Sequence, residues 1–345
     1  MTSSRYSHTA TLLNDDTDGA NDKVLIVGGF GYNSDDAVDE SNYSEQTLDA
    51  AELYNPATQR FSNTAGRLSK AAQGHTATLL GGGGQGHLRI ESKIGLLFTE
   101  IFDRGGTPGS LNGINVEKYA GIAKIYSPKF AITSDFLTQV NIINANQVSG
   151  ATVTLTLHSA DGGVLAEPAS FLIPINGQIK GNLMSLFDSN PSLQDQVGWL
   201  EVSSSADRIV GTVTFTNANN AFLASYELSG TPLGNFIYPL IAHDSTYQTE
   251  IAMLNSGSQT ANAELELWSL EGTLDAFVSL SIAPGTSIAK PLNEIFTGMQ
   301  PHRPGNVRIR SSQPLHSFAT IYTSDLRFMT SEPPVPYPET VLGPR

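Results

Sequence analysis

A long internal repeat is the feature that most constrains how this chain can fold. Residues 153–162 match residues 263–272 position by position, and farther along 198–205 match 305–312. Both copies alternate apolar and polar residues and carry Asp-Gly, Glu-Gly or Pro-Gly turn signals, a pattern typical of short antiparallel strands. The repeat therefore predicts two tandem β-sandwich domains of about one hundred residues each.

The alternation also predicts which side chains face each core. Successive side chains of a strand point to opposite faces of its sheet, so the apolar residues of each copy form one row. We expect these rows to be buried: Val153, Leu155, Leu157, Ala263, Leu265 and Leu267. A single helical turn is expected at 182–188 and again at 292–297, with Phe187 and Phe296 plugging one end of each sandwich.

Composition favours β-structure and excludes several classes of function. Only 15% of the 345 residues are charged, and 33 acidic against 19 basic side chains give a formal net charge of −14. A chain so poor in charge and rich in Thr, Ser, Asn, Gly and Val is not a helical bundle. We expect no nucleic-acid partner, because no cluster of Lys and Arg could neutralise several phosphates. With no cysteine, disulfides, thiolate metal sites and cysteine nucleophiles are excluded.

Targeting signals are absent from the sequence as given. The longest apolar stretches, 93–102 and 236–242, fall short of the ~18 residues that a membrane-spanning helix needs. We therefore expect no membrane span. The first residues show no basic segment followed by an apolar one, so no signal peptide is predicted in this chain.

The N-terminal region carries a second family of repeats. His8-Thr-Ala-Thr-Leu-Leu recurs from His75, and the first copy is followed by an apolar strand that ends in Gly28-Gly29, then by Tyr54 and Phe61. This combination resembles the kelch repeats of β-propellers, over residues 5–80. The family usually has Trp where Phe61 stands, and an acidic insertion at 32–46 separates the diglycine from Tyr54.

The resemblance implies four-stranded propeller blades, and a propeller needs about four to eight of them. Residues 1–84 hold roughly one and a half blades, so we interpret them as an incomplete kelch-like propeller fragment. We expect this segment to be less stable than the sandwiches and to be cleaved first within 32–46 or 81–86.

A third, truncated copy of the sandwich repeat precedes the two full ones. Residues 86–92 fit the same alignment column as 198–204 and 305–311. We expect strands at 88–91 and 93–102 whose apolar residues, Leu96, Leu97 and Phe98 among them, must pack on a neighbour or self-associate.

The whole chain is accordingly expected to be all-β, with tandem sandwiches that resemble immunoglobulin-like domains behind the kelch-like fragment. The expected divisions are a kelch-like fragment at 1–84, a partial sandwich at 85–125, sandwiches at 126–230 and 231–330, and a Pro-rich tail at 331–345.

Motifs that could carry chemistry are weak, and we expect no cofactor, no metal and no catalytic residue. Residues 81–86 satisfy G-x-G-x-x-G, but the following residues alternate as a strand, so a linker is favoured over a phosphate loop. Residues 14–22 have the oxygen spacing of a calcium loop, yet Leu25 stands where a bidentate Glu is required. No histidine pair has zinc-site spacing. In the kelch-like motif, His8 and His75 are expected to bond neighbouring backbone.

Two tryptophans are the candidate ligand-binding residues. Trp199 and Trp268 fall in columns that are otherwise polar and face outward, where an aromatic ring can serve as a platform for a sugar. Glu201 and Glu266 lie in the same outward columns and could accept hydrogen bonds from hydroxyl groups. The alternative is that both tryptophans pack between domains or under a loop.

These observations favour a non-enzymatic binding or adhesion protein, extracellular or on a cell surface, with carbohydrate as the leading ligand class. Another surface protein is a possible partner. Two alternatives stay open: an accessory or truncated part of a larger kelch-propeller enzyme, and spacer domains without a ligand. The localisation rests on analogy of architecture alone.

Overall fold

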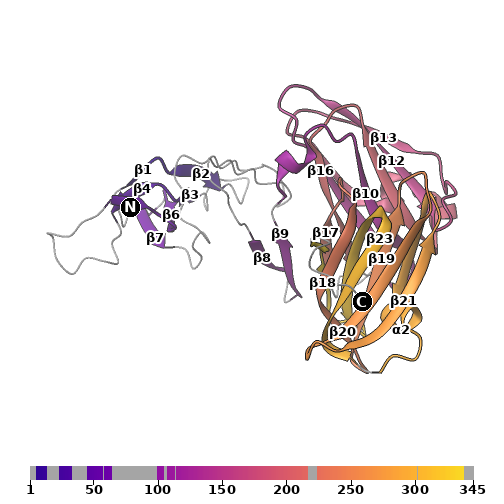
Figure 1. The fold of residues 1–345 in the computed structure, drawn as a ribbon. Helices are drawn as coiled ribbons and strands as arrows, with labels where there is room; N and C mark the ends of the chain where they lie inside the picture. The colour runs from indigo at the N-terminus through magenta and orange to yellow at the C-terminus, as the bar shows by residue number, and fades with distance from the viewer. Residues whose placement is uncertain are drawn as a thin grey trace. The chain divides into compact units, whose positions relative to one another are not determined.

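The computed structural model describes residues 5–13, 23–32, 45–56, 58–63, 99–104, 107–112, 114–216, 224–300 and 302–337. The chain divides into two compact units, Met1–Thr99 and Glu100–Arg345 (Figure 1). In the described ranges the secondary structure is nearly all strand, arranged in antiparallel sheets of which none closes on itself. The predicted all-β class is confirmed.

The first unit contains two small sheets. Its strands are β1 (Arg5–Tyr6), β2 (Thr9–Leu13), β3 (Lys23–Val27), β4 (Phe30–Tyr32), β5 (Glu45–Thr47), β6 (Ala51–Asn55) and β7 (Arg60–Asn63). The strand orders are β2-β3-β6-β7 and β1-β4-β5, and every pair is antiparallel. The diglycine follows β3 with φ of 59° at Gly28 and 103° at Gly29. A Cβ at Gly29 would lie 2.9 Å from the Cβ of His8, so only glycine fits that turn.

A buried ion pair ties the two sheets of the first unit together. Arg5 Nη2 lies 2.5 Å from Glu52 Oε1, and each of the two side chains is at most 1% exposed. The other terminal nitrogen of Arg5 donates to the carbonyls of Gly28 and Ala50, at 3.2 and 3.0 Å. The guanidinium therefore connects the start of β1 with the segments after β3 and before β6.

In the second unit, two sandwiches follow one another. The strands up to the end of the first sandwich are β8 (Thr99–Arg104), β9 (Thr107–Asn112), β10 (Lys124–Ile132), β11 (Leu137–Asn144), β12 (Ala151–Ser159), β13 (Ala169–Ile173), β14 (Gln178–Asn182), β15 (Gln196–Ser204), β16 (Ile209–Thr216) and β17 (Ala224–Glu227). Front sheet 1 has the order β13-β12-β15-β10, and back sheet 1 consists of β14, β11, β16 and β17. The turn from β10 to β11 connects the two sheets.

The second sandwich repeats this strand order. Its strands are β18 (Leu233–His243), β19 (Tyr247–Asn255), β20 (Ala261–Ser269), β21 (Leu274–Ile282), β22 (Thr286–Pro291), β23 (His302–Thr323), β24 (Met329–Glu332) and β25 (Val335–Pro336). Front sheet 2 has the order β21-β20-β23-β18-β25, and back sheet 2 consists of β22, β19, β23 and β24. The long strand β23 belongs to both sheets and corresponds to β15 plus β16.

Equivalent strands of the two sandwiches pair in the same register. His158 lies opposite Trp199 across β12 and β15, and Trp268 lies opposite Asn306 at the same place in β20 and β23. A single helical turn follows the fifth strand in both, as α1 (Leu183–Leu186) and α2 (Leu292–Ile295). The two expected helical turns are confirmed.

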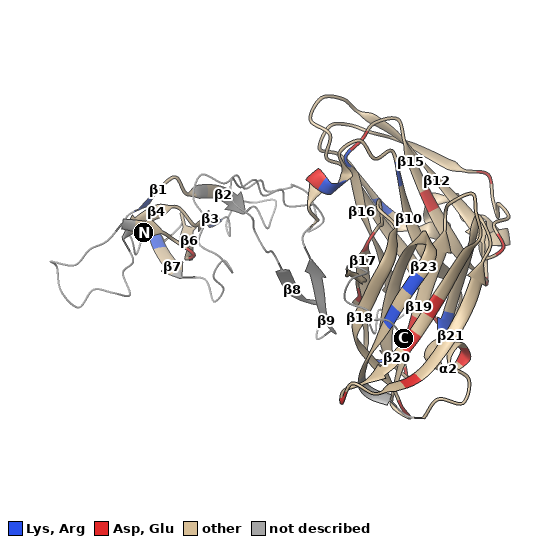
Figure 2. Cartoon of the chain, in the orientation of Figure 1, with Lys and Arg blue, Asp and Glu red and all other residues tan. Residues whose placement is uncertain are grey.

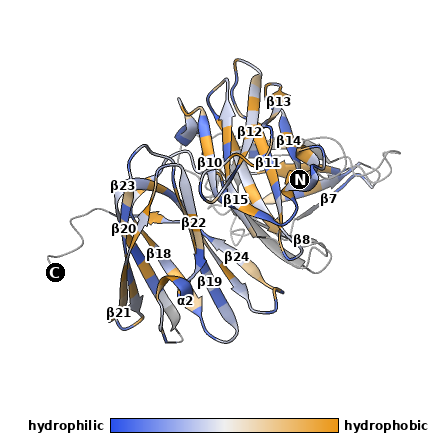
Figure 3. Ribbon diagram, turned by 90° about the vertical axis from the view of Figure 1, so that its right-hand side faces the viewer, coloured by the Kyte–Doolittle hydropathy of each residue, from blue (hydrophilic) through white to orange (hydrophobic). Residues whose placement is uncertain are grey.

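Each sandwich encloses an apolar core, and the alternation of hydrophobic and hydrophilic bands along the strands is visible in Figure 3. Every residue of the predicted inward rows is at most 1% exposed, and the two end-plugging phenylalanines are buried. The first core also includes Ala252, Phe318 and Met329 from back sheet 2. The two sandwiches thus share apolar packing within one compact unit.

Several expectations lie outside the described residues: the 14–22 loop, His75, the 81–86 glycines and the strand at 88–91. Of the expected strand at 93–102, residues 99–102 are described and belong to β8. The segment expected as a Pro-rich tail, 331–345, begins inside β24, which pairs with β23, and continues through β25, which pairs with β18 at the edge of front sheet 2. In the described part of the chain, no helix has the length and apolar character to cross a membrane.

Candidate functional site

Trp199 is buried, contrary to the expectation that it faces solvent. Its side chain lies on the outer face of front sheet 1, but the residue is only 5% exposed. The indole stacks on His158 with ring centroids 3.8 Å apart and an interplanar angle of 5°, and Tyr126 lies on its other flank at 6.4 Å. The expected exposure is wrong, and the ring contacts of the indole are with His158 and Tyr126 of the same sheet.

The second sandwich contacts this end of the sheet at two points. The Tyr126 ring lies 4.5 Å from His316 of β23, and the backbone N–H of Ser287 donates to the carbonyl of Ala160 at 2.8 Å. Trp199 therefore lies next to Tyr126, which itself contacts the second sandwich; packing between domains was the alternative considered for both tryptophans. Its assignment to a ligand stays a prediction.

His316 is a deeply buried ionisable group at the contact between the two sandwiches, which we name the seam. Its Nδ1 lies 2.8 Å from Ser229 Oγ and its Nε2 3.1 Å from Ser256 Oγ, so each ring nitrogen has a hydroxyl partner. Burial lowers the pKa of His316 to about 4. The imidazole is consequently neutral at pH 7 and acts as a structural link.

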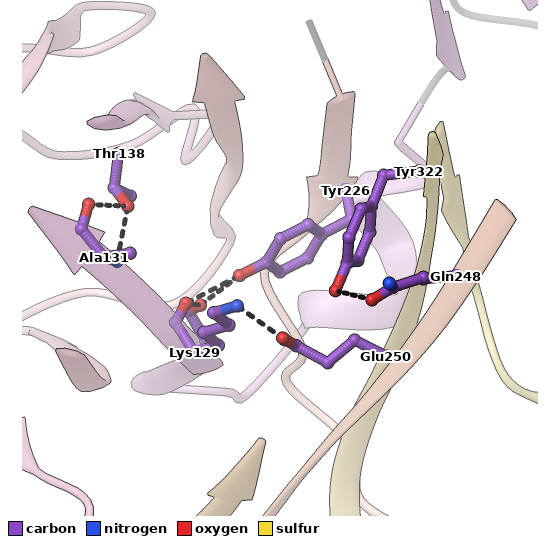
Figure 4. Close-up of polar contacts among 8 residues, drawn as sticks. Lys129, Ala131, Thr138, Tyr226, Gln248, Glu250 and Tyr322 are labelled. Carbon is purple, nitrogen blue, oxygen red and sulfur yellow. Dashed lines mark hydrogen bonds and ion pairs between the residues drawn. The ribbon is translucent and has the colours of Figure 1, made fainter. Parts of the chain in front are cut away.

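A second polar cluster crosses the same seam (Figure 4). Lys129 Nζ of β10 lies 2.5 Å from Glu250 Oε1 of β19, with both side chains largely buried. The hydroxyl of Tyr226 donates to the Lys129 carbonyl at 2.9 Å and also contacts Ser127 Oγ. Phe318 stacks on the Tyr226 ring at 3.8 Å. An ion pair that is enclosed by aromatic rings serves to hold the sandwiches in one arrangement.

Glu201 shares the outer face of front sheet 1 with Trp199. Its carboxylate lies 2.9 Å from Lys124 Nζ across the β10–β15 pair. Burial, and after it the Glu201 charge, raises the pKa of Tyr126. Both predicted site residues of the first sandwich are therefore engaged by neighbouring groups of the chain.

Trp268 occupies a more open place on the outer face of front sheet 2. Its Nε1–H donates to Glu266 Oε2 at 3.0 Å, and the guanidinium carbon of Arg308 lies 4.6 Å from the ring centroid. Glu266 itself is 8% exposed, so the predicted acceptor is a buried carboxylate. The structure brings Trp268 and Glu266 together, as expected.

Three polar residues that the sequence reasoning missed lie on the same face. Asn235 stands opposite Arg310, and Asn306 stands opposite Trp268. The charges of Arg310, Glu266 and Arg308 act on Tyr337, whose pKa is raised chiefly by burial. Within the described residues, Asn235 Oδ1, Asn306 Oδ1 and the Tyr337 hydroxyl are buried without a hydrogen-bond partner.

These residues define what we name the Trp268 face: Trp268, Glu266, Arg308, Asn306, Asn235 and Tyr337. Basic residues on β23 are visible in Figure 2, and Arg310 lies 3.7 Å from Glu264 beside them. A signal for Asn306 existed in the sequence, because it shares an alignment column with Trp199. The sequence held no such signal for Tyr337, because this residue follows a run of prolines.

A metal site was not expected, and the described part of the chain shows no cluster of ligands for one. No group of three or more His, Asp or Glu side chains gathers there in a way that could hold a metal ion. The His8 Nδ1 atom is buried without a partner among the described residues, so its expected bond to backbone through that atom is not seen.

Comparisons with known proteins add little. No model of a known protein family matches the chain, and no curated protein does. Among solved structures, Thermotoga maritima 1070 matches with a TM-score of 0.24 and 13% identity, over 27% of this chain and 91% of that one. A TM-score of that size carries no argument about fold or function.

Proposed function

We propose that this chain is a non-enzymatic binding protein of the extracellular space or a cell surface, and that the Trp268 face binds carbohydrate. The observation that carries the proposal is the presence of three unpartnered buried polar atoms on the sheet face that also carries an aromatic ring and two fixed charged groups. Buried polar atoms without partners are uncommon in native proteins, and a ligand is one way of satisfying them.

A sugar matches this set of groups chemically. Its hydroxyls both donate and accept, so they suit the two amide oxygens, the Tyr337 hydroxyl and the Glu266 carboxylate. Arg308 is held by its contact with Trp268 and offers several N–H donors in a fixed plane. Aromatic rings supply the apolar contact for the C–H faces of a pyranose.

The architecture supports a surface role by analogy. The order β2-β3-β6-β7 fits one kelch-like blade, with the diglycine directly after β3 and Tyr54 packed on Phe61 at 4.7 Å. We propose the two sandwiches as immunoglobulin-like. Tandem sandwiches behind propeller repeats are a layout of adhesion proteins.

Glycan-array binding by the full chain tests the proposal. We expect the wild-type chain to bind a subset of glycans, Trp268→Ala to lose that binding, and Glu266→Gln to weaken it. The matched control is Thr156→Ala, at the position of β12 that corresponds to Glu266, and it should bind like wild type. A chain that binds no glycan, or a Trp268→Ala variant that binds as well as wild type, overturns the assignment.

A second candidate is an accessory part of a larger kelch-propeller enzyme. It is favoured by the blade-like sheet of the first unit, in which β2 and β7 are terminal strands among the described residues. Further diglycine-and-tyrosine repeats in the full reading frame of the native protein would support it. Glycan binding by this chain alone, together with a reading frame that lacks such repeats, would reject it.

A further inference from the structure

Strand β21 forms a long edge of front sheet 2. It runs over Leu274–Ile282, pairs with β20 on one side, and is the terminal strand of its sheet within the described ranges. The outer N–H and C=O groups of a terminal strand can pair with another strand. Natural edge strands usually avoid such pairing through a lysine, a proline, a bulge or a short length. The nine residues of β21 include neither lysine nor proline, and Asp275 is their one charge. The one register shift between β20 and β21 lies at the Leu274 end, at Asp275, and residues 276–282 pair regularly.

Two other edges of the front sheets, β13 and β25, do carry such protection. The equivalent strand β13 has only five residues, Ala169–Ile173, and lies between Pro168 and Pro174. At the opposite edge of front sheet 2, β25 is two residues long and ends at Pro336. Since the two sandwiches agree in register, the difference between β13 and β21 is specific to this edge.

The inward row of β21 is incompletely covered. Ala276, Val278 and Leu280 pack on the second core, but each stays partly exposed at the edge of the sheet. Core-facing residues on the inner strands of the same sheet, such as Leu265 and Ile309, are fully buried. One more strand beside β21 would cover the row and extend the core.

We propose that the missing strand is β21 of a second copy of this chain. The strand is self-complementary: an antiparallel register centred on Val278 places Val278 opposite its own symmetry mate and Ala276 opposite Leu280. On the outward face the same register places Asp275 opposite Ser281, so the charge does not meet itself. Apolar pairs on the core side and a charge opposite a hydroxyl are favourable cross-strand partners.

This pairing has a consequence for binding, which rests on the proposed carbohydrate function. The two-fold axis of an antiparallel pair stands perpendicular to the sheet, so the outer faces of both copies lie on the same side. The dimer would present two Trp268 faces toward one surface. Two weak sites that engage together bind far more tightly than either alone.

The mass of the full chain in solution tests the dimer. By sedimentation equilibrium from about 1 to about 100 μM, a range in which a micromolar dimer changes population, we expect wild type to rise from 36.8 kDa to twice that mass. Ser279→Lys places a charge on the exposed face of β21 and should stay monomeric while remaining folded. The matched control Ser170→Lys alters the equivalent exposed position of β13 and should dimerise like wild type.

The register has its own test, because the chain contains no cysteine. Val278→Cys should form an intermolecular disulfide under mild oxidation, whereas Ala276→Cys, which would lie opposite Leu280, should not. A monomeric wild type, or a Ser279→Lys variant that dimerises normally, overturns the proposal, and equal crosslinking of both cysteine variants overturns the register. If wild type dimerises but binds no glycan, the dimer stands and the proposed function falls.

Discussion

At the scale of single residues, the two tryptophans show how equivalent faces acquire different roles. Trp199 is buried, stacked on His158 and flanked by Tyr126, whereas Trp268 is only partly buried and lies beside Arg308. We expect Trp199→Ala to lower the free energy of unfolding by about 3 kcal/mol or more, in line with other buried aromatic truncations. Trp268→Ala should cost about 1 kcal/mol, as for most partly exposed positions. Urea unfolding of both variants measures the difference, and equal losses would contradict it.

His316 predicts a specific loss of stability in acid. Its pKa is lowered by burial from 6.5 to about 4 in the folded chain. The unfolded chain therefore takes up a proton first, and stability falls as the pH drops from about 7 toward 4, by up to about 3 kcal/mol. Because His316→Gln cannot titrate, its stability should depend less on pH across this window. Urea midpoints of both proteins at several pH values measure the effect; parallel curves would show that His316 does not cause it.

At the scale of elements, the sequence predicted well which side chains of a strand face the core. It predicted poorly which outward side chains are covered by other parts of the chain. The inward rows of β12 and β20 follow from alternation alone, since any two-sheet packing buries that face. The same alternation placed Trp199 outward correctly. It could not predict the contact between Tyr126, which flanks the indole, and His316, because that contact depends on how one sandwich docks on the next. The Trp268–Glu266 pair was predictable since it is local to one strand, whereas Tyr337 reaches it from a distant segment.

Gly198 marks a close approach between elements β12 and β15. A Cβ built there would lie 1.8 Å from the carbonyl oxygen of His158, so the strands must shift to accept any side chain. We expect Gly198→Ala to destabilise the chain by about 2 to 3 kcal/mol, the range for overpacked interiors. The control Gly234→Ala adds a methyl group whose nearest neighbour is 3.9 Å away, and it should change stability by about 0.5 kcal/mol or less. Thermal melts compare the two, and similar midpoints would refute the strain.

At the scale of the whole molecule, the two units differ in how much apolar surface they bury. In the described part of the first unit, the buried apolar side chains are Ile26 and Leu48, while each sandwich has an extensive core. The buried Arg5–Glu52 pair does not compensate, because such pairs contribute little net stability. We expect the first unit to unfold at a lower temperature than the sandwiches. Hydrogen exchange of the full chain checks this, and equal protection of β3 and β12 would count against it.

The two sandwiches should unfold together. Phe318 of the second sandwich is buried against Tyr226 and Phe215 of the first, and Lys129 pairs with Glu250 across the same seam. We expect Phe318→Ala to cost about 3 to 5 kcal/mol and to shift one calorimetric transition that contains both sandwiches. The control Phe328→Ala removes an exposed ring and should cost less than about 1 kcal/mol. If the sandwiches were independent, Phe318→Ala would split the calorimetric transition in two and would leave the amide protection of β12 and β15, in the first sandwich, unchanged. If they share a core, amide protection should fall in both sandwiches at once.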